Sequence, residues 1–285
     1  MKRHHAFVGL LLVGCLFILP RVACAQSEMP VNASRFQRQG VTVGLGLAPT
    51  CFDSYLSPNG YTGLSANVGL EQWRALPWCD GHLYAQTFSQ TTLGLAVAGG
   101  ASSELLAMED LSYALPWQWY ANDWLRLYAG AEVQGRLGGI WNTRNSNNPA
   151  NLKAGIHLGG MAMAEFRYRL GRFPVRSAVS FDMPLLGAFF SPEYTQSYYE
   201  LFYVGGVSPY VHFATPVNCL SGRGRMVTDF TLHHSILRLS FVEDNYRWQT
   251  RTNQYALHTF SLGIGFVFNA YRIHPHETAA SFLPY

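Results

Sequence analysis

The stretch TFSLGIGFVFN, residues 259–269, decides the fold. Its large apolar side chains all fall on even-numbered positions: Phe260, Leu262, Ile264, Phe266 and Phe268. The odd-numbered positions are small or polar, except for Val267. A β-strand sends successive side chains to opposite faces. The stretch therefore predicts a strand with one apolar face and one small, polar face.

The same alternation occurs in 123–141, 153–170 and 174–189. In these stretches the positions between the apolar residues include charged side chains. These charged positions are Arg126, Glu132, Arg136, Glu165, Arg167, Arg169, Arg176 and Asp182. A soluble exported β-sandwich with its polar face in water is one interpretation. Strands that reach the ~9–11 residues needed to cross a bilayer, with Trp and Tyr near their ends, favour a membrane barrel instead. Strands that span a membrane must close into a barrel, because lipid leaves no backbone group hydrated.

Twelve strands can be assigned: 41–49, 61–75, 81–97, 104–117, 123–140, 153–169, 174–189, 197–205, 208–215, 226–241, 245–251 and 255–271. An even number suits a bacterial barrel, and ten strands are the alternative count. The apolar phase slips within 226–241, which we interpret as a β-bulge near Ser235. Long and short connections alternate, as extracellular loops and periplasmic turns do. The prediction is an all-β, transmembrane, antiparallel up-and-down β-barrel with both termini in the periplasm.

The first 25 residues have the order of features of a secretory signal peptide. A basic start is followed by an apolar run over 7–20 and by the small residues Ala23, Cys24 and Ala25. A lipoprotein site at Cys15 is the competing interpretation, but the apolar residues 16–19 would make an unusual mature start. We expect cleavage after Ala25. Residues 26–285 would then form one outer-membrane barrel with a short periplasmic C-terminal tail.

Charge and motifs exclude several classes of function. Charged residues make up 13% of the chain, about half the usual share. Beyond residue 25 the basic and acidic residues are equal in number, which indicates no basic patch for nucleic acid. Phosphate-binding loops, nucleotide fingerprints and zinc-protease motifs are absent, so no cofactor is expected. The tail holds His274, His276 and Glu277, but no third ligand nearby, and we predict no metal site.

Two resemblances support the barrel prediction. Ser261, Gly263, Phe266 and Phe268 resemble the terminal-strand signal of Gram-negative outer-membrane barrels, although 17 residues follow Phe268. That resemblance implies recognition by the barrel-assembly machinery and a location in the outer membrane. The segments 145–151 and 191–200 resemble motifs of an uncharacterised exported family, a domain of unknown function. This second resemblance implies an outer-membrane barrel in contact with lipid, over nearly the whole mature chain, and it supplies no activity.

The leading functional hypothesis is a non-enzymatic barrel. Charges facing the lumen can set the selectivity of a narrow pore for small polar solutes, or they can form ion pairs that fill a closed barrel. The two segments 145–151 and 191–200 would be extracellular loops, where amides, aromatics and carboxylates suit a surface ligand. The candidate binding residues are Asn147, Asn148, Asn151, Glu193, Tyr194, Gln196, Tyr198 and Glu200. The alternative for these loops is that their polar side chains only form local turns.

A lipid hydrolase is the alternative function. His233 and Ser235 are two residues apart, so the predicted strand would place them on one face. The pair resembles the His-x-Ser of outer-membrane phospholipases, which implies a histidine base and a serine nucleophile. The Asn-Gly that usually follows in those enzymes is missing here. We therefore expect two polar residues without a catalytic role, and a protein that is not an enzyme.

Three cysteines follow residue 25. The predicted topology places Cys51 and Cys219 on the extracellular side and Cys79 in a periplasmic turn. An exported protein can form disulfides. If one forms in this chain, the pairing that we predict is Cys51 with Cys219.

Overall fold

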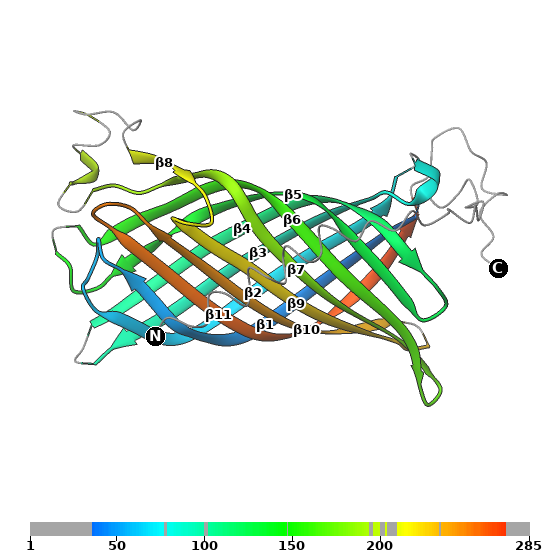
Figure 1. The fold of residues 1–285 in the computed structure, drawn as a ribbon. Helices are drawn as coiled ribbons and strands as arrows, with labels where there is room; N and C mark the ends of the chain where they lie inside the picture. The colour runs from blue at the N-terminus through cyan, green and yellow to red at the C-terminus, as the bar shows by residue number, and fades with distance from the viewer. Residues whose placement is uncertain are drawn as a thin grey trace, which may run out of the picture. The chain divides into compact units, whose positions relative to one another are not determined.

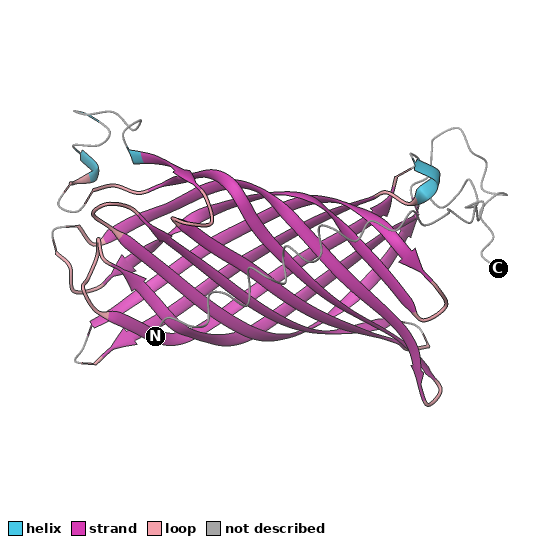
Figure 2. Ribbon diagram, viewed as in Figure 1, coloured by secondary structure: helices cyan, strands magenta, loops and turns pink. Residues whose placement is uncertain are grey.

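The computed structural model describes residues 36–76, 79–99, 102–146, 148–193, 196–199, 203, 210–233 and 235–271. The predicted signal peptide and the tail with His274, His276 and Glu277 lie outside these residues. The described chain forms eleven antiparallel strands in one sheet (Figures 1 and 2). They are β1 (Phe36–Asp53), β2 (Gly60–Ala75), β3 (Tyr84–Ala98), β4 (Ser102–Ala121), β5 (Leu125–Asn142), β6 (Ala150–Leu170), β7 (Phe173–Phe190), β8 (Val211–Ala214), β9 (Cys219–Thr231), β10 (Ile236–Gln249) and β11 (Gln254–Tyr271).

Ten of these strands close into a barrel. The sheet order is β6-β5-β4-β3-β2-β1-β11-β10-β9-β7, and β7 also pairs with β6, which completes the ring. β1 pairs with β11 from Phe36 opposite Tyr271 to Asp53 opposite Tyr255. The stretch 259–269 therefore lies in the seam where the first and last strands meet. The four-residue strand β8 pairs only with the last residues of β7 and is not a barrel strand.

The predicted strand 226–241 is wrong, because it spans two strands and the turn between them. β9 ends at Thr231 and β10 begins at Ile236, with the Leu232 N–H donating to the Ser235 carbonyl (2.8 Å) in the turn between them. The phase slip is thus a hairpin and not a bulge. Residues 245–251 do not form a separate strand, because β10 runs on to Gln249. These two corrections cancel in the strand count. The barrel has ten strands, the alternative count, because the predicted strand 208–215 forms only β8, outside the ring, and the described residues of the predicted strand 197–205 are not in a strand.

The connections between the strands divide between the two ends of the barrel. The connections 54–59, 99–101, 143–149, 191–218 and 250–253 lie at one end, which we call the loop end. The connections 76–83, 122–124, 171–172 and 232–235 lie at the other, together with the start of β1 and the end of β11. We call this the turn end. Within the described residues no helix is long and apolar enough to cross a membrane.

The outer wall is apolar and the interior carries the charges. Val43, Leu45 and Leu64 are 56%, 73% and 67% exposed on the outer wall. Asp182 and Arg238, by contrast, are buried inside the barrel. This distribution is the inverse of a soluble domain and is typical of a barrel in lipid. Because the sheet closes on itself, the alternative of an open β-sandwich is wrong.

A close approach of two strands makes Gly63 in β2 a position where only glycine fits. A Cβ added there would lie 1.9 Å from the Leu95 carbonyl oxygen of β3. We expect Gly63→Ala to push the strands apart and to lower the free energy of unfolding by about 1–3 kcal/mol. The temperature at which the folded band converts on a detergent gel would measure this. The matched control is Gly224→Ala in β9, where nothing lies within 4 Å. Equal losses in both variants would contradict the prediction.

Candidate functional site

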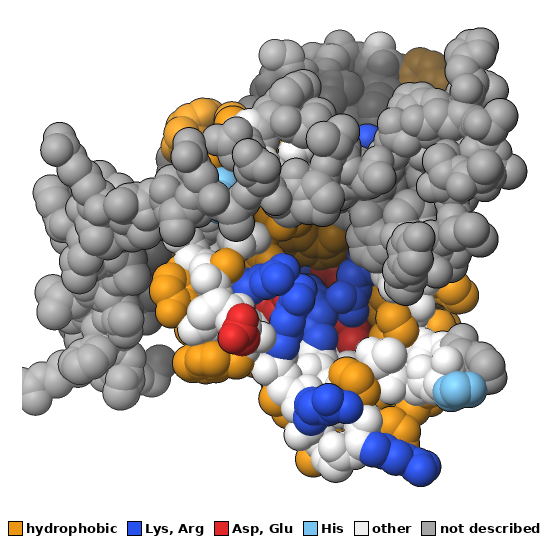
Figure 3. Space-filling model, turned by 90° about the vertical axis from the view of Figure 1, so that its right-hand side faces the viewer, with side chains coloured by type: hydrophobic (Ala, Val, Ile, Leu, Met, Phe, Trp, Pro, Cys, Tyr) orange, Lys and Arg blue, Asp and Glu red, His pale blue; other side chains and the backbone are white. Residues whose placement is uncertain are grey.

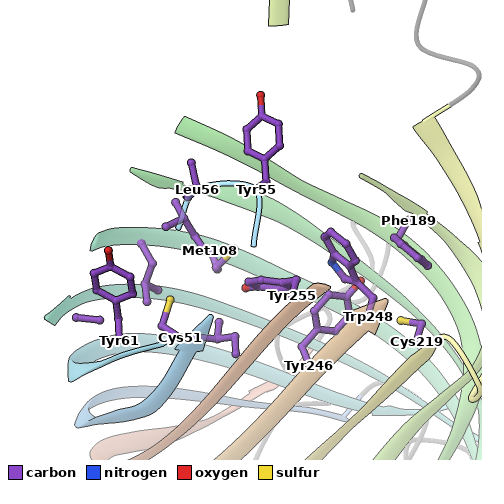
Figure 4. Close-up of a cluster of buried hydrophobic side chains, with 14 of the residues drawn as sticks. Cys51, Tyr55, Leu56, Tyr61, Met108, Phe189, Cys219, Tyr246, Trp248 and Tyr255 are labelled. Carbon is purple, nitrogen blue, oxygen red and sulfur yellow. The ribbon is translucent and has the colours of Figure 1, made fainter. Parts of the chain in front are cut away.

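At the loop end the lumen is crossed by a buried lysine in an aromatic cage. Lys153 of β6 places its Nζ 2.7 Å from an Asp53 carboxylate oxygen of β1, on the opposite side of the ring. The same Nζ lies 4.2 Å from the ring centre of Tyr255 and 4.8 Å from that of Trp248. Figure 4 shows Trp248, Tyr255 and Tyr246 gathered inside the barrel at this level. The ion pair and its aromatic neighbours therefore join opposite walls.

The loops fold over this level and bond to one another. The Tyr55 hydroxyl donates to the Gln196 carbonyl (2.6 Å), and the Asn253 amide donates to the Pro192 carbonyl. The Tyr198 hydroxyl donates to the Asn151 side chain (2.9 Å) and accepts from the Leu152 N–H (2.6 Å). Burial raises the pKa of the Tyr198 hydroxyl well above its usual value. These contacts hold the loops as a cap on the loop end.

A quartet of charges crosses the middle of the lumen. Arg136 of β5 donates from Nε to Asp110 of β4 (2.5 Å) and from Nη2 to Asp244 of β10. Arg223 of β9 lies 3.3 Å from Asp110 and 3.7 Å from Asp244. The Tyr246 ring lies beneath Arg136, with 4.2 Å between the guanidinium carbon and the ring centre. Each carboxylate thus faces two guanidiniums, so the four charges compensate one another.

A second network of alternating charges continues toward the turn end. Arg238 bonds both Asp229 (2.7 Å) and Glu71 (2.6 Å), so it joins β10 with β9 and with β2 across the ring. Arg225 then joins Glu71 (3.4 Å) to Asp182 (3.2 Å). Two cavities of about 20 Å³ each lie beside this network and beside the quartet, room for roughly one water molecule each. In the described part of the chain, side chains therefore bridge the lumen at three levels.

The turn end carries more cations than anions. Arg176 bonds Glu165 (2.7 Å) and Asp229 (3.1 Å), Arg167 bonds Glu165 (2.8 Å), and Arg38 bonds Asp229. Arg126 of β5 is half-buried and stands directly opposite Glu165 in the strand register. Figure 3 looks onto this end and shows Lys and Arg side chains gathered around the opening, with Asp and Glu beneath them. We call the group Arg38, Arg126, Arg167 and Arg176 the arginine mouth.

The structure places the eight sequence-predicted lumen residues in two groups. Glu132, Arg136, Glu165 and Asp182 are buried in the interior. Arg126, Arg167, Arg169 and Arg176 lie toward the turn end, where Arg167 and Arg169 are exposed. Sequence reasoning missed the partners that complete the networks: Asp53, Glu71, Asp110, Lys153, Arg223, Arg225, Asp229, Arg238 and Asp244. The alternation of side chains along the predicted strands was enough to place Asp110 and Lys153 on the lumen face. Arg223 and Asp244 lie in segments that were predicted as connections.

Some of the predicted loop ligand residues bond within the protein where the structure describes them, Asn151 and Tyr198 through their side chains and Asn148 and Gln196 through their backbone. Asn151 is buried and bonds Asp53 (2.8 Å) as well as Tyr198. The backbone N–H of Asn148 donates to Asn145, and that of Gln196 to the Glu193 carbonyl. Asn147, Tyr194 and Glu200 lie outside the described residues. The geometry favours local turns in these loops over an open surface site.

Cys51 and Cys219, the pair that we name in case a disulfide forms, are not bonded to each other in the structure. Cys51 and Cys219 lie in one buried cluster at the loop end, as the topology predicted, and Cys79 lies at the turn end. Both buried thiols are free cysteines. Cys51 donates to Glu104 (3.4 Å), and the Cys219 sulfur lies 3.6 Å from His157 Nε2. The prediction that Cys51 and Cys219 lie at the same end of the barrel was correct, but lying at the same end does not bring two sulfurs into bonding distance.

The His233 and Ser235 interpretation requires a correction. Both residues lie in the exposed β9–β10 turn and not within a strand. The rule that residues two apart share a strand face therefore does not apply to them. The hydrolase hypothesis therefore loses the shared strand face on which it depended.

Fold and lumen together define a class: an antiparallel β-barrel with an apolar outer wall and a lumen bridged by charged side chains. The chain belongs to the family described as Protein of unknown function (DUF3316), whose model matches residues 9–277. No curated protein matches the sequence.

The chain is similar to several solved structures at low sequence identity. The outer membrane protease OmpT from Escherichia coli is 6% identical, with a TM-score of 0.47 over 85% of this chain and 99% of that one. The β domain of the Bordetella autotransporter BrkA is 12% identical, with a TM-score of 0.42 over 84% of this chain and 100% of that one. An outer membrane channel from Pseudomonas putida F1 is 10% identical, with a TM-score of 0.37 over 87% of this chain and 99% of that one.

Proposed function

We propose that this protein is an integral outer-membrane β-barrel that does not conduct solutes and acts as a rigid, non-enzymatic binding barrel. The bridged lumen carries the proposal. Lys153 with Asp53, the quartet around Arg136, and Arg238 with Glu71 join strands that are not neighbours in the ring. A pore for polar solutes would need these ion pairs to separate, which leaves buried charges without partners.

The outer wall and the last strand support a location in the outer membrane. Aliphatic side chains such as Leu45 and Leu262 are exposed on the wall, which suits lipid and not water. Phe266 and Phe268 project from the outer face of β11 and are about half exposed, so the assembly machinery could contact them before the barrel closes. Export through a cleaved signal peptide completes the proposal.

Planar-bilayer recording tests the non-conducting barrel against the narrow pore. Purified protein whose gel mobility shifts on boiling would be reconstituted in a lipid bilayer in potassium chloride. We expect no stepwise current, because the ion pairs stay closed. Steady single-channel steps that scale with the number of inserted barrels would overturn the proposal and establish the pore. Proteoliposomes that take up a small neutral sugar faster than empty ones would do the same.

A further inference from the structure

The arginine mouth holds two guanidiniums side by side. Arg167 of β6 and Arg176 of β7 are register partners, and like charges that face each other across two strands destabilise a sheet. Both arginines share one carboxylate, Glu165. Arg38 and Arg176 likewise share Asp229, which also bonds Arg238. Three guanidiniums of the mouth, those of Arg38, Arg167 and Arg176, thus share two carboxylates, one of which also bonds Arg238. The quartet in the middle of the lumen, by contrast, is balanced.

Donor groups in the mouth are also left without acceptors. The Nε atoms of Arg38 and Arg126 are buried and have no hydrogen-bond partner among the described residues. Buried donors of this kind normally find a partner, and an unfilled one indicates a ligand or water. Arg167, whose side chain is 44% exposed, leaves the mouth open to solvent. The mouth therefore combines excess positive charge, unused donors and access.

An aromatic wall borders the mouth. Trp73, Tyr84 and Tyr128 pack edge to face, with ring centres 5.4–6.3 Å apart. Tyr128 lies on β5 two residues from Arg126, on the same face of the strand. Such a wall lowers the local dielectric, so a charge-assisted hydrogen bond at its edge is stronger than in water.

We propose that the arginine mouth binds an anionic oxyacid group, a phosphate or a carboxylate. Guanidiniums match the planar, two-oxygen face of these groups. The group can belong to a free solute or to the head group of an anionic lipid at the membrane surface. This inference rests on the proposed function and deepens it, because it names the chemical group that a closed, non-conducting barrel would bind.

Tryptophan fluorescence can report binding, since Trp73 lies in the aromatic wall. One arm titrates inorganic phosphate at low ionic strength into the protein in zwitterionic detergent. The other arm compares nanodiscs of phosphatidylglycerol with nanodiscs of phosphatidylcholine. The variant is Arg126→Gln with Arg167→Gln, and the control is Arg251→Gln, an exposed arginine at the loop end. Unchanged gel mobility before boiling would show that each variant is folded.

We expect the double variant to bind about tenfold more weakly or worse, and the control to bind as the unchanged protein does. Weakened phosphate binding assigns the site to a free solute. A response only to phosphatidylglycerol, lost in the double variant, assigns it to a lipid head group. If neither probe separates the double variant from Arg251→Gln, the proposal is overturned. Should the double variant fail to fold, Arg167→Gln alone decides, because its exposed side chain tolerates replacement.

Discussion

Replacing Arg136 by methionine is expected to lower the free energy of unfolding by about 3–5 kcal/mol, because it breaks a buried ion pair on one side only. Asp110 and Asp244 would then share the single guanidinium of Arg223, which lies farther from both. Urea unfolding in detergent micelles, followed by tryptophan fluorescence, would measure the loss.

Two further variants separate the loss of the ion pairs from other effects of the substitution. Arg247→Met removes an exposed arginine of β10, the strand that carries Asp244, and should change stability little. Replacing the whole quartet, with methionine for Arg136 and Arg223 and leucine for Asp110 and Asp244, should recover most of the loss, because no unpaired charge is left. An Arg136→Met protein as stable as Arg247→Met would show that the quartet contributes no stability.

Lys153→Met is expected to have an effect of similar size, about 3–5 kcal/mol, at the loop end. Asp53 would stay buried, with the Asn151 amide (2.8 Å) and the Tyr55 backbone N–H (3.2 Å) but no opposite charge. The same urea unfolding experiment applies. A thermodynamic cycle with Asp53→Asn and the double variant would isolate the coupling of the two residues. Additive single effects would contradict a direct contribution of this ion pair.

The period-two pattern predicted which side chains face the lumen, because a strand has only two faces. Glu132 and Asp182 are buried inside the barrel as that phase requires. The same pattern could not distinguish a bulge from a four-residue turn, because both move the apolar side chains from even-numbered to odd-numbered positions. A bulge inserts one residue, and the turn places Thr231 opposite Ile236, five positions away. That ambiguity misplaced His233 and Ser235 in a strand. It also hid Arg223 and Asp244 in predicted connections.

The partners across the lumen could not be predicted from the sequence. Which residue of β1 faces which residue of β6 depends on how far each strand is displaced along its neighbour around the whole ring. A displacement of two residues would keep every side chain on its face and would still separate Lys153 from Asp53. The same limit explains why the free state of Cys51 and Cys219 could not be predicted. The alternation of side chains and the end of the barrel place both thiols in one cluster, but they do not determine the distance between the two sulfurs.

The ion pairs across the lumen also determine how the finished barrel can come apart. Asp53 and Lys153 stand on strands from opposite sides of the ring, so they meet only when the edges β1 and β11 have joined. Before that moment both charges are hydrated, and afterwards neither is. Reopening the edge of the closed barrel would separate the two charges after their water has been replaced by side chains, which makes a half-open barrel a costly intermediate. Closure should be an all-or-none event late in folding, and the assembled wall should resist the sideways parting of strands that would admit lipid or another chain.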